Sequence, residues 1–122
     1  MVTLDPAQLV GAGGVLGALL RHGVSRRVDV EEFPAGVFTV NVLGSFALGL
    51  VAFLGAGNDL ALFLGTGACG SFTTFSSFSF ETVRLWETGD RAKATLHAGG
   101  TLLGAGVALG LAWAVAHFLV GA

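Results

Sequence analysis

Four long apolar stretches separated by three short polar segments dominate the pattern of the chain. The stretches cover about residues 7–24, 35–54, 60–86 and 94–120. Between them lie an acidic segment (28–34), a glycine-rich turn (55–59) and a charged segment (88–93). A helix needs about 20 predominantly apolar residues to cross a bilayer. The pattern therefore predicts an all-α integral membrane protein, in which four transmembrane helices form a single domain over residues 1–122.

Composition supports this prediction and narrows it. Only 11% of the residues are charged, about half the fraction usual in soluble domains, and the mean hydropathy is +0.80. Asp5 and Pro6, not a basic region, precede the first apolar stretch, so we interpret it as a retained span and not as a cleaved signal peptide. Cys69 is the single cysteine, which excludes an internal disulfide. No basic patch is present, and we expect no nucleic-acid partner.

The most unusual segment runs from Gly70 to Glu81. From Ser71 to Phe80, six of ten residues are Ser or Thr and the other four are Phe. Nearby glycines weaken the helix, and broken backbone at membrane depth is tolerated only where protein buries it or where it lines a wet cavity. A Ser/Thr-rich helix-packing surface is the alternative. The density of hydroxyls and rings favours a site or a pathway.

Polar residues also interrupt the other spans. Asn41 is equally compatible with a hydrogen bond between helices and with a position lining water. His97 and Thr101 lie one turn apart in the fourth span, where they either extend a polar lining or bond across helices. Arg21, one turn past the first apolar run, is either an interfacial anchor or a cation that draws an anion toward a vestibule.

Three segments of the chain match one known family. They are Gly13 to Arg21, Asn41 to Phe46, and Gly70 to Ser79. Together they resemble the small four-helix fluoride channels, the Fluc or CrcB family, and the similarity extends over essentially the whole chain. The resemblance implies an antiparallel dimer of the dual-topology type, with two fluoride pathways along its interface. It also implies a third helix broken at its centre and a structural sodium ion that is not transported.

The resemblance assigns roles to individual residues. The backbone carbonyls of Gly70 and Thr73 hold the sodium ion. The fluoride pathway comprises Asn41, Thr74, Phe75, Ser76, Phe78 and, as a looser match, Thr101. Arg21 and Glu81 match positions at a vestibule or pathway end. His97 stands where many members carry an aromatic hydroxyl, so its role stays open.

The chemistry of these residue types agrees with that assignment. Fluoride is small and strongly hydrated, so close donors such as amide and hydroxyl groups must replace its water. A phenyl edge is electropositive and meets an anion in the ring plane. The residues form no nucleophile–base pair, so we do not expect an enzyme. We expect a multi-pass channel in the cell membrane that lets fluoride leave passively and so lowers its cytoplasmic level.

Two other functions compete with this one. A proton-coupled exporter of similar four-helix dimeric build needs an acid within a span, whereas Glu81 lies near a span end and the other spans contain none. A non-conducting membrane assembly subunit would use glycines at the four-residue spacing, such as Gly13 and Gly17. It would not explain the density of Phe, Ser and Thr.

Basic residues are distributed unevenly about the predicted membrane. All six Lys and Arg border the first and third loops: Arg21, Arg26, Arg27, Arg84, Arg91 and Lys93. The positive-inside rule places these loops in the cytoplasm and both termini outside. A fixed topology would require an oppositely oriented homologue as the second subunit of an antiparallel dimer. Insertion in both orientations would instead allow a homodimer.

Overall fold

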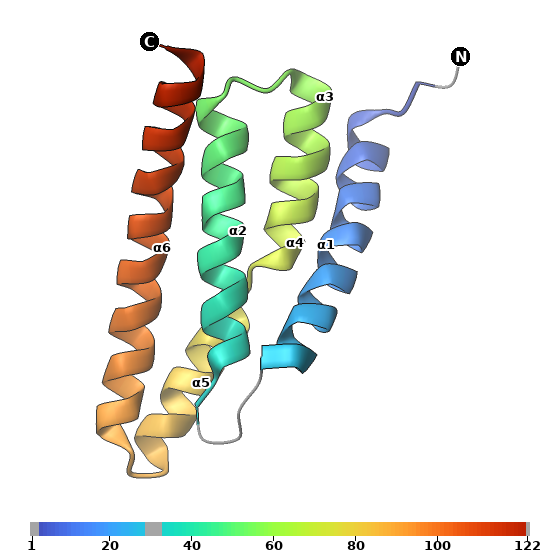
Figure 1. Cartoon of the computed structure of the whole chain (residues 1–122). Helices are drawn as coiled ribbons and strands as arrows, with labels where there is room; N and C mark the ends of the chain where they lie inside the picture. Colours follow the sequence, from blue (N-terminus) through green and yellow to red (C-terminus); the bar gives the residue numbers. More distant parts are fainter. Residues whose placement is uncertain (1–2, 29–32, 122) are drawn as a thin grey trace.

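The computed structural model describes residues 3–28 and 33–121 and is all-helical, with four main helical segments. The first, second and fourth segments are α1 (Pro6–Val28), α2 (Ala35–Phe53) and α6 (Arg91–Val120). The third comprises α3 (Asn58–Leu60), the π-helix η1 (Ala61–Cys69), α4 (Gly70–Phe72) and α5 (Phe75–Glu87). Figure 1 shows the start of α1 and the end of α6 at the same end of the bundle.

The helix bounds differ from the predicted spans mainly at the ends. Helix α1 continues to Val28 and so includes the basic residues that we expected to follow it. The predicted turn and the charged segment both contain a glycine with positive φ, Gly55 at 71° and Gly89 at 89°, a conformation that costs glycine nothing. Helix α6 begins three residues early because the side chain of Asp90 accepts a hydrogen bond from the backbone N–H of Lys93.

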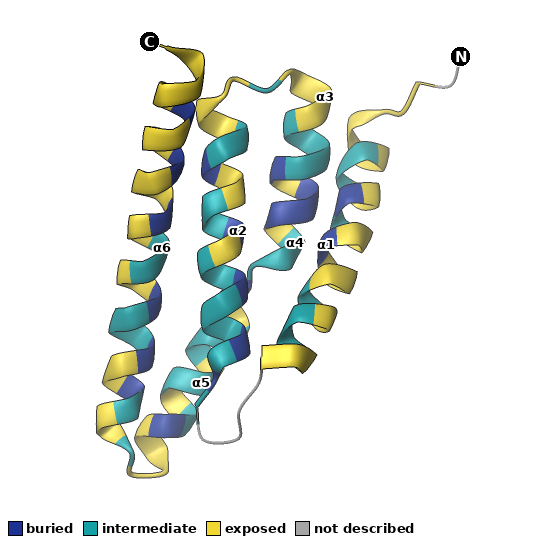
Figure 2. Ribbon diagram, in the orientation of Figure 1, coloured by how far each residue is buried: buried dark blue, intermediate teal, exposed yellow. Residues whose placement is uncertain are grey.

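Among the described residues, α2 and α6 have the length and composition of membrane spans, each with a mean hydropathy of 1.9. Figure 2 shows much of the surface of α6 exposed along its length. Leu103 and Phe118 are 73% and 85% exposed. A soluble monomer rarely presents so continuous an apolar surface, so lipid or another chain is the natural neighbour of this face.

Glycine lets α1 approach the third segment closely. Gly13 and Gly17 are buried, and an added Cβ would overlap the carbonyl oxygen of Phe63 at the first position and that of Ala68 at the second. Gly11 and Gly14 on the same helix have open space around them. The pair spaced by four residues is therefore the one that brings the two backbones together.

The third segment is interrupted between α4 and α5. Thr73 has φ −80° and ψ 162°, and Thr74 has φ −150° and ψ 117°, so both residues are extended. The hydroxyl oxygen of Thr74 accepts a hydrogen bond from the backbone N–H of Ser77 at 3.1 Å and caps α5. The break therefore falls within the Ser/Thr/Phe segment, where the glycine-rich helix gives way to capping residues.

Candidate ion site at the helix break

The side-chain amide of Asn41 holds the backbone at the break. Its Nδ2 donates to the carbonyl oxygen of Thr74 at 3.0 Å, and its Oδ1 accepts from the backbone N–H of Thr74 at 2.7 Å. One side chain from α2 thus pairs both polar backbone groups of an extended residue 33 positions away. The sequence left open whether Asn41 bonds to another helix or lines water. The structure shows the hydrogen bonds to another helical segment.

This pairing changes which backbone carbonyls remain available. In a continuous α-helix the N–H of Thr74 would bond to the carbonyl of Gly70, and that of Ser77 to the carbonyl of Thr73. Instead, Thr74 donates to Asn41, and Ser77 donates to the hydroxyl of Thr74. The carbonyls of Gly70 and Thr73 therefore lose the donors that a helix would give them.

Arg21 reaches one of these carbonyls from α1. Its Nη1 donates to the carbonyl oxygen of Thr73 at 3.4 Å, across 52 positions of sequence. Nearby, the hydroxyl of Ser71 donates to the carbonyl of Gly14 at 2.7 Å and ties α1 to the segment just before the break. Arg21, which we expected at a vestibule or pathway end, therefore lies against the break.

The freed carbonyls suit a hard cation. Backbone oxygens are good ligands for such ions, and the carbonyl of Thr73 has a second lone pair besides the one facing Arg21. One chain offers two of these oxygens, which is too few to enclose an ion. In residues 3–28 and 33–121, no group of three or more His, Cys, Asp or Glu side chains could hold a metal ion.

A cavity of about 250 Å³ opens beside the break. Its wall comes from α2, the break, α5 and α6, and its polar members include Asn41, Ser45, Thr74 and Thr101. Phe75 and Phe78 line it as well. Five of the six predicted pathway residues therefore share one wall. Ser76 is exposed outside it, with its hydroxyl 3.4 Å from that of Thr74.

Two of the aromatic rings that line this cavity continue into a row of rings beyond it. The ring centroids of Phe75 and Phe78 are 5.9 Å apart, and those of Phe78 and His97 are 5.4 Å apart. Phe33 meets His97 edge-on at 5.7 Å. Phe75 is 79% exposed, so its ring is free to contact a further molecule.

His97 and Thr101 are both buried on α6. The hydroxyl of Thr101 lacks a hydrogen-bond partner among the described residues. The ring of His97 lies against the Phe78 backbone of α5, although neither ring nitrogen makes a hydrogen bond of good geometry in that part of the chain. Of the two residues, His97 therefore makes the contact across helices that the sequence left open. Buried polar groups without partners, such as the Thr101 hydroxyl, are rare because each one costs free energy.

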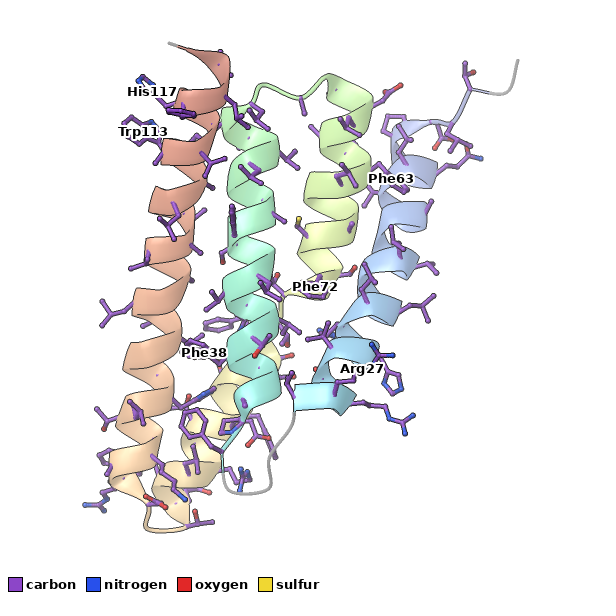
Figure 3. The ribbon with its side chains drawn as sticks, in the orientation of Figure 1. Arg27, Phe38, Phe63, Phe72, Trp113 and His117 are labelled. Atoms are coloured by element: carbon purple, nitrogen blue, oxygen red, sulfur yellow. The ribbon has the colours of Figure 1, made fainter. Side chains whose placement is uncertain are left out.

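Glu81 is paired with Arg84, a pairing that our sequence analysis did not predict. Two guanidinium nitrogens of Arg84 lie 2.8 and 2.6 Å from the same carboxylate oxygen of Glu81. The three-residue spacing of opposite charges on a helix was the available signal. Glu81 follows Phe78 by one turn of α5 and is not in the cavity wall. Trp113 and His117 stack far along α6 and project away from the bundle (Figure 3).

A comparison with known protein families identifies the family of the chain. Residues 8–117 match the family described as CrcB-like protein, Camphor Resistance (CrcB). The chain belongs to the CrcB-like family.

Several curated relatives of this CrcB-like chain are similar to it over most of its length. Fluoride-specific ion channel FluC 2 of Haloarcula marismortui is 58% identical over 119 residues, which cover 98% of this chain and 100% of the relative. Fluoride-specific ion channel FluC 1 of Halobacterium salinarum is 52% identical and covers 88% of this chain and 91% of its own. The FluC of Paracoccus denitrificans is 44% identical, with coverage of 92% and 90%.

Replacing Asn41 by Ala should destabilise the protein. The substitution removes both partners of the Thr74 backbone, and leaving such a group unpaired costs roughly 1–3 kcal/mol. Asn41→Asp should also destabilise it, because a carboxylate accepts from the N–H of Thr74 but turns its second oxygen toward the Thr74 carbonyl oxygen. Thermal unfolding of the purified protein in detergent measures both. Ser45→Ala, in the same cavity wall, is the control and should change little. Equal unfolding temperatures for all three variants would contradict the clamp.

Proposed function

We propose that this chain is a fluoride-selective ion channel that lets fluoride leave the cell passively and lowers its cytoplasmic concentration. The observation that carries the proposal is the cavity at the helix break, where one amide, four hydroxyl-bearing residues and two phenyl rings share one wall. The relatives in the same family are fluoride-specific ion channels by name, and two of them are more than half identical to this chain.

Donors in the cavity would replace the water around fluoride. The amide nitrogen of Asn41 has two N–H groups and uses one on the carbonyl of Thr74, which leaves one for an ion. The hydroxyls of Thr74 and Thr101 are in the same wall, with that of Ser76 close to Thr74. The electropositive ring edges of Phe75 and Phe78 would add weak contacts that neither bind fluoride tightly nor exclude it.

The two sides of the break favour ions of opposite sign. Helix α5 starts at the break, and the first N–H groups of a helix, together with its dipole, favour an anion. Helix α4 ends there and presents carbonyl oxygens, which favour a cation. A fluoride pathway along α5 beside a sodium site at the end of α4 follows from this polarity.

The proposed assembly is an antiparallel dimer in the cell membrane. One chain supplies an open cavity, an exposed Phe75 and two carbonyls that lack a helical donor. A second subunit would close the cavity and double the number of these carbonyls. The resulting four oxygens from Gly70 and Thr73 of each subunit would hold a structural sodium ion. The second subunit is either the same chain or an oppositely oriented homologue.

A proton-coupled exporter is less well supported. Glu81, the acid closest along α5 to Phe78, is held by two nitrogens of Arg84. No observation of the described residues favours this function over a channel.

Fluoride efflux from liposomes tests the function. Purified protein should release fluoride down its gradient, read with a fluoride electrode, and should release chloride far more slowly. Efflux should continue when a protonophore and a potassium ionophore collapse the proton gradient and the membrane potential, because a channel needs no coupling ion. Efflux that stops when the proton gradient is removed would identify a transporter instead.

Phe75→Ile and Phe78→Ile should each strongly reduce fluoride flux, by at least tenfold, while the protein still folds. Isoleucine has comparable bulk but no electropositive ring edge. Phe80→Ile is the matched control, since Phe80 lies on the same helix, is 65% exposed and is not in the cavity wall. Flux equal to the control in both variants would mean that the two rings only fill space.

Sodium should stabilise the protein without passing through it. Replacement of sodium by N-methylglucamine during prolonged dialysis should cause slow loss of fluoride flux, and returning sodium early should prevent it. A binding site that favours the folded dimer gives this result. Undiminished flux after exhaustive sodium removal would exclude the sodium cage.

The orientation of the subunit can be decided by labelling. Single cysteines at Asn58 and Asp90, in a Cys69→Ser background, should label from opposite sides of intact cells. We expect Asn58 outside and Asp90 in the cytoplasm, because all Lys and Arg border the two loops on that side. Equal labelling of each position from both sides would establish dual insertion and a homodimer.

A further inference from the structure

Arg21 contacts the same carbonyl that the proposed sodium site uses. We propose that Arg21 is a positioning residue that sets the sodium affinity of the helix break. Its guanidinium donates a hydrogen bond to one lone pair of the Thr73 oxygen. Its positive charge weakens the binding of sodium to the second lone pair. When sodium is absent, the guanidinium is the positive charge at this carbonyl. The proposal rests on the sodium cage of the proposed function and adds a residue that tunes it.

The guanidinium is held at the break by its own helix. Gly13 and Gly17 bring α1 against the backbone of η1, and the Ser71 hydroxyl bonds to the carbonyl of Gly14 at 2.7 Å. Arg21 follows Gly17 by about one turn and is half-buried. The side chain therefore starts from a backbone that is fixed relative to the break.

Thr73 can accept this bond because its helical donor is taken. The N–H of Ser77 donates to the Thr74 hydroxyl at 3.1 Å, so the Thr73 oxygen has no donor from α5. The guanidinium supplies one at 3.4 Å. A carbonyl oxygen has two lone pairs, so a cation has room on the second.

The positive charge at Arg21 is permanent and, within the described part of the chain, has no acidic partner. Arg84 pairs with Glu81 and Lys93 with Asp90, both on the far side of the break from α1 in sequence. An arginine stays protonated at all relevant pH values. A sodium ion on the Thr73 oxygen would therefore lie a few Å from a like charge that no acid of residues 3–28 and 33–121 pairs with.

Two effects of Arg21 on sodium oppose each other, and their sizes decide the direction. The hydrogen bond fixes the carbonyl in place, which favours the ion, but at 3.4 Å it is long and its net contribution is small. Repulsion between like charges at this range in a partly buried site is larger. Removing the charge should therefore tighten sodium binding, on the order of tenfold.

The experiment is a sodium titration of thermal unfolding. Wild type, Arg21→Gln, Arg21→Met and Arg21→Lys would be purified in detergent, with N-methylglucamine keeping the ionic strength constant. The sodium concentration for half-maximal stabilisation should fall about tenfold in the Gln and Met variants. It should stay near the wild-type value in the Lys variant, which retains the charge. Arg27→Gln removes the same charge from the exposed end of α1 (Figure 3) and should leave the titration unchanged.

Each outcome has one meaning. If sodium stabilises the wild type but the Gln and Met curves coincide with it, or shift to higher sodium, the inference about Arg21 is wrong and the cage survives. If sodium stabilises no variant, the cage and the inference both fail, while the fluoride efflux assay still decides the channel function. If Arg27→Gln shifts the curve as much as Arg21→Gln, general surface charge is responsible and the inference is wrong.

Discussion

The structure of the helix break depends on which acceptor the backbone N–H of Thr74 bonds to. Thr74 donates to Asn41 and not to Gly70, and its carbonyl accepts from the same amide. Because both polar groups of Thr74 are satisfied from α2, the third segment can leave the helix without leaving that residue unpaired. The carbonyl end of α4, the capped start of α5 and the cavity between them all follow from this exchange. A broken helix inside a membrane is stable only with such a partner.

Close packing of α1 against η1 brings the charged side chain of Arg21 within reach of the break. Gly13 and Gly17 remove the side chains that would separate α1 from η1, and Gly67 does the same from the other side, where an added Cβ would overlap the Val10 carbonyl oxygen. The backbone distance that results lets Arg21 reach Thr73. Packing and electrostatics are therefore coupled here, because a bulkier residue at either glycine would also move the guanidinium away from the break.

Several features of the described residues point to a site that a second chain would complete. Its cavity is open and Phe75 is 79% exposed. A second subunit would cover both. The proposed dimer thus accounts for these two observations, and for the two carbonyls at the break without a helical donor, with one assembly.

The sequence alone determined the helical class, the positions of the four segments and the residues that carry polar chemistry, because hydropathy, glycine content and hydroxyl density are local properties. It also pointed to the segment that contains the break, since glycines that weaken a helix lie next to a dense run of Ser, Thr and Phe. Only the tertiary structure decided that Asn41 holds Thr74, that Arg21 contacts Thr73, that Ser76 lies outside the cavity wall and that His97 packs against Phe78. The first two of these contacts join positions 33 and 52 residues apart. They depend on how the helices rotate and approach one another, and glycine contacts between backbones set that geometry where no periodic pattern records it.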